Sequence, residues 1–513
     1  MTDARRRLLT ALRMAIAICL LTPASGRLAA QEIDALLARP PFSRALWGVV
    51  LVDERGRVLY ARNADKLFMP ASVTKLLVTS VAAARLPADW TVRTSLYAAG
   101  PVDAGTIRGD LVLYGRGDPT FSRRCFAVDT TAPGACERDP SSGFRRLASQ
   151  LKARGITRIE GDVVGDGSWF EPTGIRGTWQ SYDLNWWYAA PVSGLGFNDN
   201  SLEISWRPGP TVGAPLAIDI QPAFAGITLD NRTETAPPGT RQTLDFFRYP
   251  GTLRLWAEGK AAGPATGQPP TEYFAHPDPS LFAAQALRAA LEDSGIVVTG
   301  AVRSTLDSTA TQAARARAPL AEVTSRPLRD WLFPILNVSQ NLFAEMLLKQ
   351  LGRQFAGAGS WEAGIDVERR FLIDSMGVDS TQFRVTDGSG LSTSNLLTPL
   401  ALVTVLRYLR QHPSFDTFAA GLPRSGQVGS LRRRFVDTPL EGKVRAKTGS
   451  INGVNTLAGY IELPERTLTF AVMVNHHTAP SREMLAAIDS VVVRLARMKR
   501  PSSSAQAALK VRR

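Results

Sequence analysis

The amino-acid sequence predicts an α+β protein whose main domain is interrupted by β-rich inserted material. A β-hairpin pattern covers residues 47–64, and three strand patterns follow one another between residues 444 and 475. Helical periodicity ends the ordered chain at 481–498. Between these parts, residues 95–275 consist of short alternating apolar runs separated by Gly- and Pro-rich turns, which indicates inserted strands.

The individual elements follow from local patterns. In the hairpin, the apolar run Gly48–Val52 leads through an Asp- and Gly-containing turn to a return strand at 58–61. A helix is predicted from Met69 to Ala84, with Pro70 in its first turn, where the missing N–H costs nothing. Further helices are predicted at 278–294 and 328–352. The Gly-, Pro- and Ala-rich stretch 259–270 is predicted to be a surface loop.

A chain of 513 residues exceeds what one hydrophobic core usually supports, so two or three domains are expected. The patterns divide it into five parts: a leader (1–30), a first part of the main domain (31–94), the insertion (95–275), a second part of the main domain (276–498) and a disordered basic tail (499–513).

The formal net charge of +14 is concentrated at the two ends of the chain. The first 30 residues hold five arginines and one aspartate, and residues 499–513 hold five basic side chains and no acid. No basic stripe interleaved with aromatic residues is present, so nucleic-acid binding is not predicted. The tail could make weak contact with an anionic membrane surface or with the cell wall.

The N-terminus resembles a secretory signal. Arginines 5–7 precede an apolar run from Met14 to Leu21, which Pro23 and small residues follow. Cleavage is expected after Gly26 or Ala30, with export to the periplasm. The alternative is a membrane anchor, but the run is about half of the roughly 20 residues that a spanning helix needs.

Two cysteines, Cys125 and Cys136, remain after removal of such a leader. A close pair in an exported chain predicts a disulfide that closes a small loop within the insertion. A metal or redox pair is the alternative, but further ligands are absent nearby and the spacing does not suit a redox motif. No residue cluster has zinc-ligand spacing, so neither a metal nor another cofactor is predicted.

Three short motifs occur in order along the chain, and together they indicate acyl-serine chemistry. They are S-x-x-K at Ser72–Lys75, S-x-N at Ser339–Asn341 and K-T-G at Lys447–Gly449. Each motif alone has an ordinary structural explanation, such as a helix cap or a charged strand edge. Their order and their local contexts make a joint occurrence by chance improbable.

The chemistry requires these residue types. Lys75 lies one helical turn from Ser72 and can accept its proton, provided that burial and nearby cations keep the amine neutral. Lys447 is such a cation, and with Thr448 it could hold a carboxylate of the substrate. Ser339 could relay the proton to the leaving amine.

The remaining motif positions suit substrate binding. Asn341 could hold the substrate amide, and Gly449 belongs to the strand edge that carries Ser450. The backbone N–H groups of Ser72 and Ser450 are expected to form an oxyanion hole. A Ser-His-Asp hydrolase would have to use one of only four histidines, and no nucleophile-elbow motif accompanies them.

Longer segments resemble the low-molecular-mass class C penicillin-binding proteins, which are D-Ala-D-Ala carboxypeptidase/endopeptidases. The resemblance spans roughly residues 35–495 and includes Gly109–Leu113, Gly117–Thr120, Ala190–Ser193, Ser339–Leu348, Asp387–Ser392 and Gly442–Gly449. It implies a β-lactamase/transpeptidase-like fold, an antiparallel sheet flanked by helices plus a helical subdomain, with extra domains inserted between the first two motifs. It also implies action on peptidoglycan stem peptides and cross-links, and covalent inhibition by β-lactams.

The same resemblance suggests that Asp183 binds the free amine of a diamino acid in the stem, with Tyr188 stacking nearby. Thr393 stands where some relatives carry an arginine, so the resemblance does not extend to recognition of a second carboxylate on that diamino acid. Two alternatives stay open from the sequence. One is a β-lactamase-like hydrolase, and the other is a non-catalytic wall-binding or penicillin-sensing module.

Overall fold

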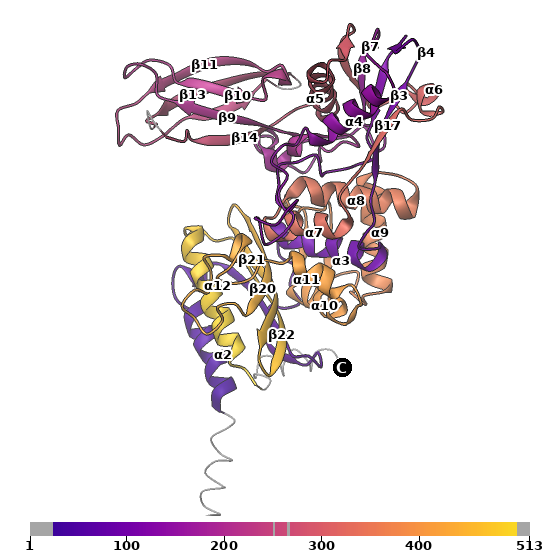
Figure 1. The fold of residues 1–513 in the computed structure, drawn as a ribbon. Helices are drawn as coiled ribbons and strands as arrows, with labels where there is room; N and C mark the ends of the chain where they lie inside the picture. The colour runs from indigo at the N-terminus through magenta and orange to yellow at the C-terminus, as the bar shows by residue number, and fades with distance from the viewer. Residues whose placement is uncertain (1–23, 250–251, 264–266, 500–513) are drawn as a thin grey trace, which may run out of the picture.

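The structure, a computed structural model, describes residues 24–249, 252–263 and 267–499 (Figure 1). The predicted signal segment lies outside these residues up to position 23, and so does the basic tail beyond Lys499. Among the described residues, no helix combines the length and the apolar character needed to cross a membrane.

The main domain is built on a five-stranded antiparallel sheet. The first two strands come from the predicted hairpin and the last three from the predicted C-terminal strands, in the order β2-β1-β22-β21-β20. The strands are β1 (Leu46–Val52), β2 (Val58–Arg62), β20 (Val444–Ile451), β21 (Val454–Leu463) and β22 (Arg466–Asn475). The predicted antiparallel sheet is therefore confirmed, and β20 lies at its edge.

Helices cover both faces of this sheet. Because side chains alternate along a strand, Val49 and Leu51 pack with α2 (Ala24–Leu37) and α12 (Ser481–Ala496), while Val50 faces the other side. On that other side lies the helical subdomain, which contains α3 (Lys75–Arg85), α7 (Leu328–Asn337), α8 (Asn341–Ala356), α9 (Trp361–Asp374), α10 (Pro399–Gln411) and α11 (Phe415–Gly421). The two-stranded ribbon of β18 (Phe383–Arg384) and β19 (Leu396–Leu397) adjoins it.

The region between the first two motifs was predicted to be β-rich, but it also contains helices, which pack with a sheet to form an α/β unit. Its five-stranded sheet, in the order β16-β8-β6-β3-β17, includes two parallel pairs, and parallel strands require crossover connections. Helices α4 and α5 pack against each other beside this sheet. The elements are β3 (Arg93–Ala98), β6 (Leu111–Tyr114), α4 (Ser142–Ala153), β8 (Val163–Asp166), α5 (Pro279–Asp293), β16 (Val302–Thr305), α6 (Gln312–Arg315) and β17 (Ala321–Thr324).

This unit differs from the sequence-based division at residue 275. Helix α5 and strands β16 and β17 come after that position, yet they pack in the same core as β3 and β6. The core therefore extends to Thr324, because the chain returns to complete the sheet before it enters α7. A small second sheet at the outer end joins β4 (Val102–Asp103), β5 (Thr106–Ile107), β7 (Arg158–Ile159) and β15 (Val297–Val298).

Two three-stranded sheets form an arm that projects sideways in Figure 1. One has the order β10-β9-β14 and the other β11-β13-β12, and they share an apolar core. The strands are β9 (Ser201–Arg207), β10 (Ala217–Gln221), β11 (Thr228–Thr235), β12 (Asp245–Arg248), β13 (Arg254–Ala261) and β14 (Thr271–Ala275). The loop predicted at 259–270 therefore begins later than expected, because pairing with β11 extends β13 to Ala261.

The predicted disulfide joins Cys125 and Cys136, which are 11 positions apart. It closes a loop in the segment between β6 and α4, and Phe126 of this loop is buried in the core of the helical subdomain. The loop thereby touches the main domain although it belongs to the inserted segment.

Candidate active site

Ser72 lies in a short 3-10 turn, Ala71–Thr74, that precedes α3. The predicted helix therefore begins as a tighter turn, after Ala71 adopts a left-handed conformation with φ 49°. Lys75, the first residue of α3, places its Nζ 2.9 Å from Ser72 Oγ. The S-x-x-K spacing thus brings the two functional atoms into hydrogen-bond contact.

The Lys75 amine is completely buried and has two further partners. Its Nζ lies 2.7 Å from Asn341 Oδ1 and 2.6 Å from the carbonyl oxygen of Ser389. Both of these oxygens can only accept hydrogen bonds. A neutral amine has two N–H groups and one lone pair, so it can donate to both oxygens and accept the hydroxyl proton of Ser72.

Burial also favours the neutral amine. It lowers the pKa of Lys75 to about 7, although the nearby carboxyl groups of Glu345 and Asp387 act in the opposite direction. An amine with such a pKa is substantially unprotonated near neutral pH, which is the condition for acting as a base.

Ser339 lies in a break between two helices. The sequence predicts one helix over 328–352, but α7 ends at Asn337 and α8 begins at Asn341. Ser339 has φ 65°, and the Gln340 side chain caps α8 by accepting a 2.9 Å hydrogen bond from the Leu342 N–H. The break turns the Ser339 hydroxyl towards the sheet, where it accepts a 2.8 Å hydrogen bond from Lys447 Nζ.

The K-T-G segment lies on edge strand β20. Lys447 is buried, and its Nζ also donates to the Thr448 carbonyl at 2.7 Å. Burial first, and then the charge of Lys75, lower the pKa of Lys447 well below its ordinary value. The charge of Lys75 thus disfavours the charged form of Lys447, whereas Lys75 owes its own lowered pKa to burial. The Thr448 hydroxyl lies 2.9 Å from Ser430 Oγ.

Gly449 lets β20 approach Ser72 closely. A Cβ atom at this position would lie 2.9 Å from the Ser72 backbone nitrogen and 2.2 Å from Thr456 Oγ1. The strand can therefore pass this closely only with glycine at 449. The next residue, Ser450, lines the same pocket as Ser72.

Asp183 and Tyr188 lie in the catalytic pocket, a cavity of about 390 Å³ that Ser72, Ser339 and Asn341 also line. The Tyr188 hydroxyl donates a 3.0 Å hydrogen bond to Asp183 Oδ1, and the Tyr188 carbonyl accepts one of 2.7 Å from Asn341 Nδ2. Burial, followed by the charge of Asp183, raises the pKa of Tyr188. The structure thus brings every sequence-predicted site residue to one region.

Sequence reasoning missed the residues that hold the Ser389 carbonyl in place beside the Lys75 amine. The buried Glu345 carboxyl accepts from the backbone N–H groups of Gly388 and Ser389, at 2.9 and 2.7 Å. Asp387 accepts from Gly390 and Ser392 in the same loop. One signal was available, because Glu345 follows Asn341 by one helical turn and so shares its face of α8.

Known proteins resemble this chain over most of its length. The D-Ala-D-Ala carboxypeptidase 3 (S13) family matches residues 29–495. A D-alanyl-D-alanine carboxypeptidase of Actinomadura sp. (strain R39) is 34% identical over 480 residues, which are 91% of this chain and 84% of the relative. The D-alanyl-D-alanine carboxypeptidase DacB of Haemophilus influenzae is 25% identical over 79% of this chain and 80% of its own length.

A solved structure shares the fold. The crystal structure of penicillin binding protein 4 (dacB) from Haemophilus influenzae superposes with a TM-score of 0.77 at 22% identity, covering 90% of this chain and 98% of that one. The β-lactamase/transpeptidase-like fold implied by the sequence resemblance is thereby confirmed.

Proposed function

The chain belongs to the D-Ala-D-Ala carboxypeptidase 3 (S13) family, and on that premise we propose that it hydrolyses peptidoglycan stem peptides through an acyl-serine intermediate on Ser72. It releases the terminal D-Ala and also cleaves cross-links between stems, and β-lactams acylate the same serine. The observation that carries this proposal is the Lys75 amine, buried between Ser72 Oγ and two obligate acceptors.

Acylation begins when Ser72 Oγ attacks the carbonyl carbon of the penultimate D-Ala and Lys75 Nζ takes the hydroxyl proton. The backbone N–H groups of Ser72 and Ser450 stabilise the oxyanion that forms. The close approach of β20 at Gly449 supports this role, since it brings the two backbones together.

The bond between the carbonyl carbon and the leaving nitrogen then breaks. The leaving amine receives the proton through Ser339, whose hydroxyl is oriented by Lys447. Lys447 takes up a proton when an anion lies beside it. Its positive charge, together with the Thr448 hydroxyl, then holds the terminal carboxylate of the leaving D-Ala. Water then attacks the acyl carbonyl carbon while Lys75 takes its proton, the bond to Ser72 Oγ breaks, and Lys75 returns the proton to that oxygen.

Asp183 is proposed to bind the free amine of the stem diamino acid, with Tyr188 stacking beside it. Their position in the pocket that contains Ser72 supports this role. The predicted signal segment supports export to the periplasm, where peptidoglycan substrates and β-lactams are accessible.

The test is incubation of the purified protein with pentapeptide monomers and cross-linked dimers, with products resolved by mass spectrometry. Wild-type protein is expected to release D-Ala and to cleave dimers, and a fluorescent penicillin should stay attached for many minutes. The Ser72→Ala variant should lose all three properties with unchanged thermal unfolding. Rapid release of hydrolysed penicillin would instead indicate a β-lactamase, and undiminished D-Ala release by Ser72→Ala would refute the mechanism.

A further inference from the structure

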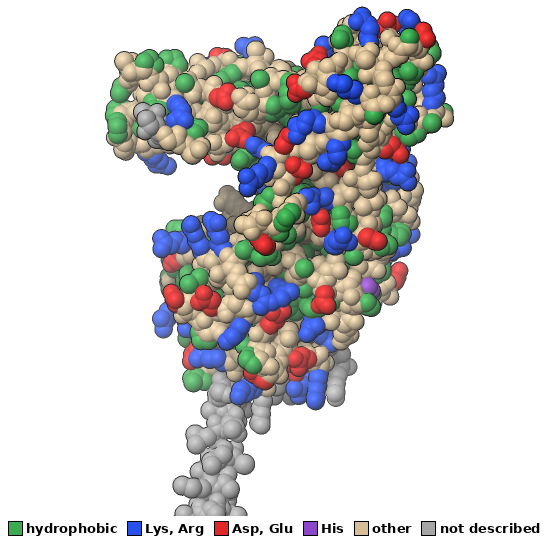
Figure 2. Space-filling model, in the orientation of Figure 1, with side chains coloured by type: hydrophobic (Ala, Val, Ile, Leu, Met, Phe, Trp, Pro, Cys, Tyr) green, Lys and Arg blue, Asp and Glu red, His purple; other side chains and the backbone are tan. Residues whose placement is uncertain are grey.

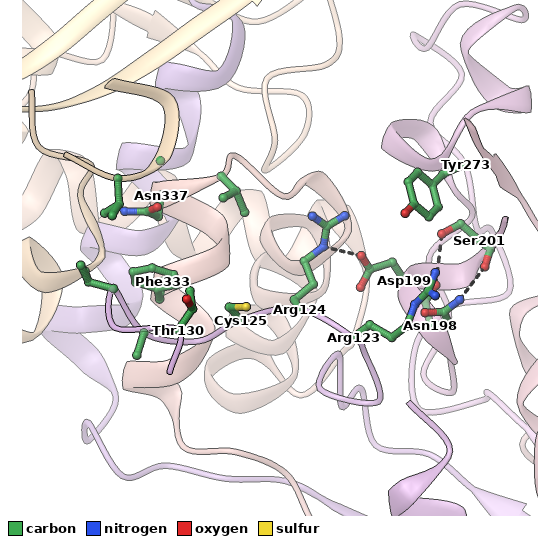
Figure 3. Close-up of a pocket in the computed structure, with 15 residues that line it drawn as sticks. Arg123, Arg124, Cys125, Thr130, Asn198, Asp199, Ser201, Tyr273, Phe333 and Asn337 are labelled. Atoms are coloured by element: carbon green, nitrogen blue, oxygen red, sulfur yellow. Dashed lines mark hydrogen bonds and ion pairs between the residues drawn. The ribbon is translucent and has the colours of Figure 1, made fainter. Parts of the chain in front are cut away.

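A second cavity of about 390 Å³, which we call the disulfide-loop pocket, shares the lining residue Val338 with the catalytic pocket. Figure 3 shows the residues around this cavity. Its walls come from the disulfide loop at 123–130, from the end of α7 and from Val428 and Gly429. The base of the arm closes it on the remaining side, with Tyr273 and Ser201. The reaction proposed above does not use this cavity.

The disulfide-loop pocket adjoins the leaving-group side of the site. Val338 lines both cavities, and the next residue is Ser339. Gly429 lines the disulfide-loop pocket, and the next residue, Ser430, contacts the Thr448 hydroxyl. In the proposed reaction Ser339 and Thr448 serve the leaving part of the substrate.

The acyl part of the substrate is bound elsewhere. Asp183 and Tyr188 line the catalytic pocket but not the disulfide-loop pocket. A substrate that reaches from Asp183 across Ser72 and past Ser339 would therefore arrive in the disulfide-loop pocket with its leaving end.

The polar groups of this pocket suit a peptide. Asn337 is only 2% exposed, and its Nδ2 has no hydrogen-bond partner among the residues that the structure describes. A buried amide donor without a partner is costly, and a ligand carbonyl would satisfy it. Glycine at position 429 lets the backbone of the pocket wall lie close to Asn337, because a Cβ atom there would lie 2.4 Å from Asn337 Oδ1.

The pocket also offers cationic groups. Arg124 pairs through Nε with Asp199 and lies 5.1 Å from the ring of Trp187, a residue of the catalytic pocket. Within the described part of the chain, Nη1 and Nη2 of Arg124 make no hydrogen bond. Figure 3 shows the Arg124 guanidinium between Asn337 on one side and Asp199 and Tyr273 on the other.

Basic groups continue outside the pocket. Arg432 and Arg433 are exposed and follow the Gly429 wall in the chain. Figure 2 shows a hollow between the arm and the main domain, with Lys and Arg side chains on both sides of it. This distribution of charge favours an anionic ligand.

We propose that the disulfide-loop pocket binds the leaving stem peptide of a cross-link. This inference rests on the proposed endopeptidase function. When a single D-Ala leaves, Lys447 and Thr448 suffice to hold it, whereas cleavage of a cross-link releases a whole second stem with amide and carboxylate groups. Asn337 donates to an amide carbonyl of that stem, Arg124 binds a carboxylate, and the exposed Val128 and Val338 cover its apolar parts.

Two variants at Val128, which is 49% exposed on the disulfide loop, test the proposal. Val128→Glu adds a repelling charge, and Val128→Trp fills the space. The matched control is Val212→Glu, at a valine that is 64% exposed on the arm and lines neither pocket. For each protein, kcat/KM is measured for cleavage of cross-linked dimers and for D-Ala release from monomers, together with the rate of penicillin acylation.

Both Val128 variants are expected to lower kcat/KM for dimers by about ten-fold while D-Ala release and penicillin acylation stay within about two-fold of wild type. Val212→Glu should leave all three unchanged. Dimer cleavage at the wild-type rate in both Val128 variants would overturn the pocket assignment alone, as would an equal loss for dimers and monomers. If the wild-type protein releases D-Ala but cleaves no dimer, the endopeptidase proposal itself fails and the inference falls with it.

Discussion

The Nζ of Lys75 lies 2.7 Å from Oδ1 of Asn341, a residue 266 positions further along the chain. This contact joins the first two motifs across the whole insertion. An amide oxygen can only accept, so Asn341 takes one N–H of the amine; the Ser389 carbonyl takes a second, and a neutral amine then has its lone pair left for the Ser72 hydroxyl. The predictions below follow from this and from neighbouring contacts.

The rate of acylation is expected to rise with pH through about 7. The pKa of Lys75 is lowered to about 7 by burial, so the base loses its proton as the pH passes that value, whereas an exposed lysine would do so near 10.5. The measurement is the second-order rate of penicillin acylation from pH 5 to 9. A rate that is flat over this range, or that falls with pH, would contradict the role of Lys75 as the base.

The Asn341→Asp variant is expected to move this rise to higher pH by about one unit, because a carboxylate at this distance stabilises the protonated amine. Acylation near pH 6.5 should then fall by about ten-fold and recover at alkaline pH. An equal loss at every pH would mean instead that Asn341 matters only for geometry.

Gly449→Ala is expected to reduce D-Ala release by about 100-fold or more, because the added methyl group would force β20 away from Ser72 and open the oxyanion hole. Gly177→Ala is the matched control, since a Cβ at 177 meets no atom within 4 Å. Steady-state kinetics on both variants make the comparison. Full activity in Gly449→Ala would show that β20 can shift without cost.

Removal of the disulfide by the double change Cys125→Ser, Cys136→Ser is expected to lower the free energy of unfolding by about 2–3 kcal/mol, as the loop-entropy relation gives for so short a loop. The measurement is denaturant unfolding under oxidising conditions. Wild-type protein under reducing conditions should match the variant, and a difference between them would implicate the serines themselves.

Cleavage of the signal segment is expected after Gly26 rather than after Ala30. Ala29 and Ala30 are 2% and 8% exposed in α2 and pack in the core shared with α12, so cleavage after Ala30 would remove buried contacts. N-terminal sequencing of the exported protein decides between the two positions. A mature chain that begins at Gln31 would contradict the expectation.

Local pattern was sufficient for much of the fold. The hairpin strands and the three C-terminal strands lie where short apolar runs predict them, because β1, β21 and β22 are buried on both faces. The helix over 481–496 lies where helical periodicity predicts it, because it buries one face. Pattern failed where tertiary contacts override it. The helix predicted at 328–352 is broken at Ser339, since Lys447 and Asp199 bind the residues of the break from other parts of the chain.

The sequence by itself was sufficient to predict which residues carry the proposed chemistry, because the order and spacing of Ser72, Lys75, Ser339, Asn341 and Lys447 match the requirements of acyl transfer to serine. It could not determine how they meet. The approach of β20 at Gly449, the Glu345 carboxyl that holds the Ser389 carbonyl, and the pocket beside the disulfide loop all depend on contacts between segments far apart in the chain. Such contacts form only when the sheet, the helical subdomain and the insertion pack together, and periodicity within a single segment carries no information about them.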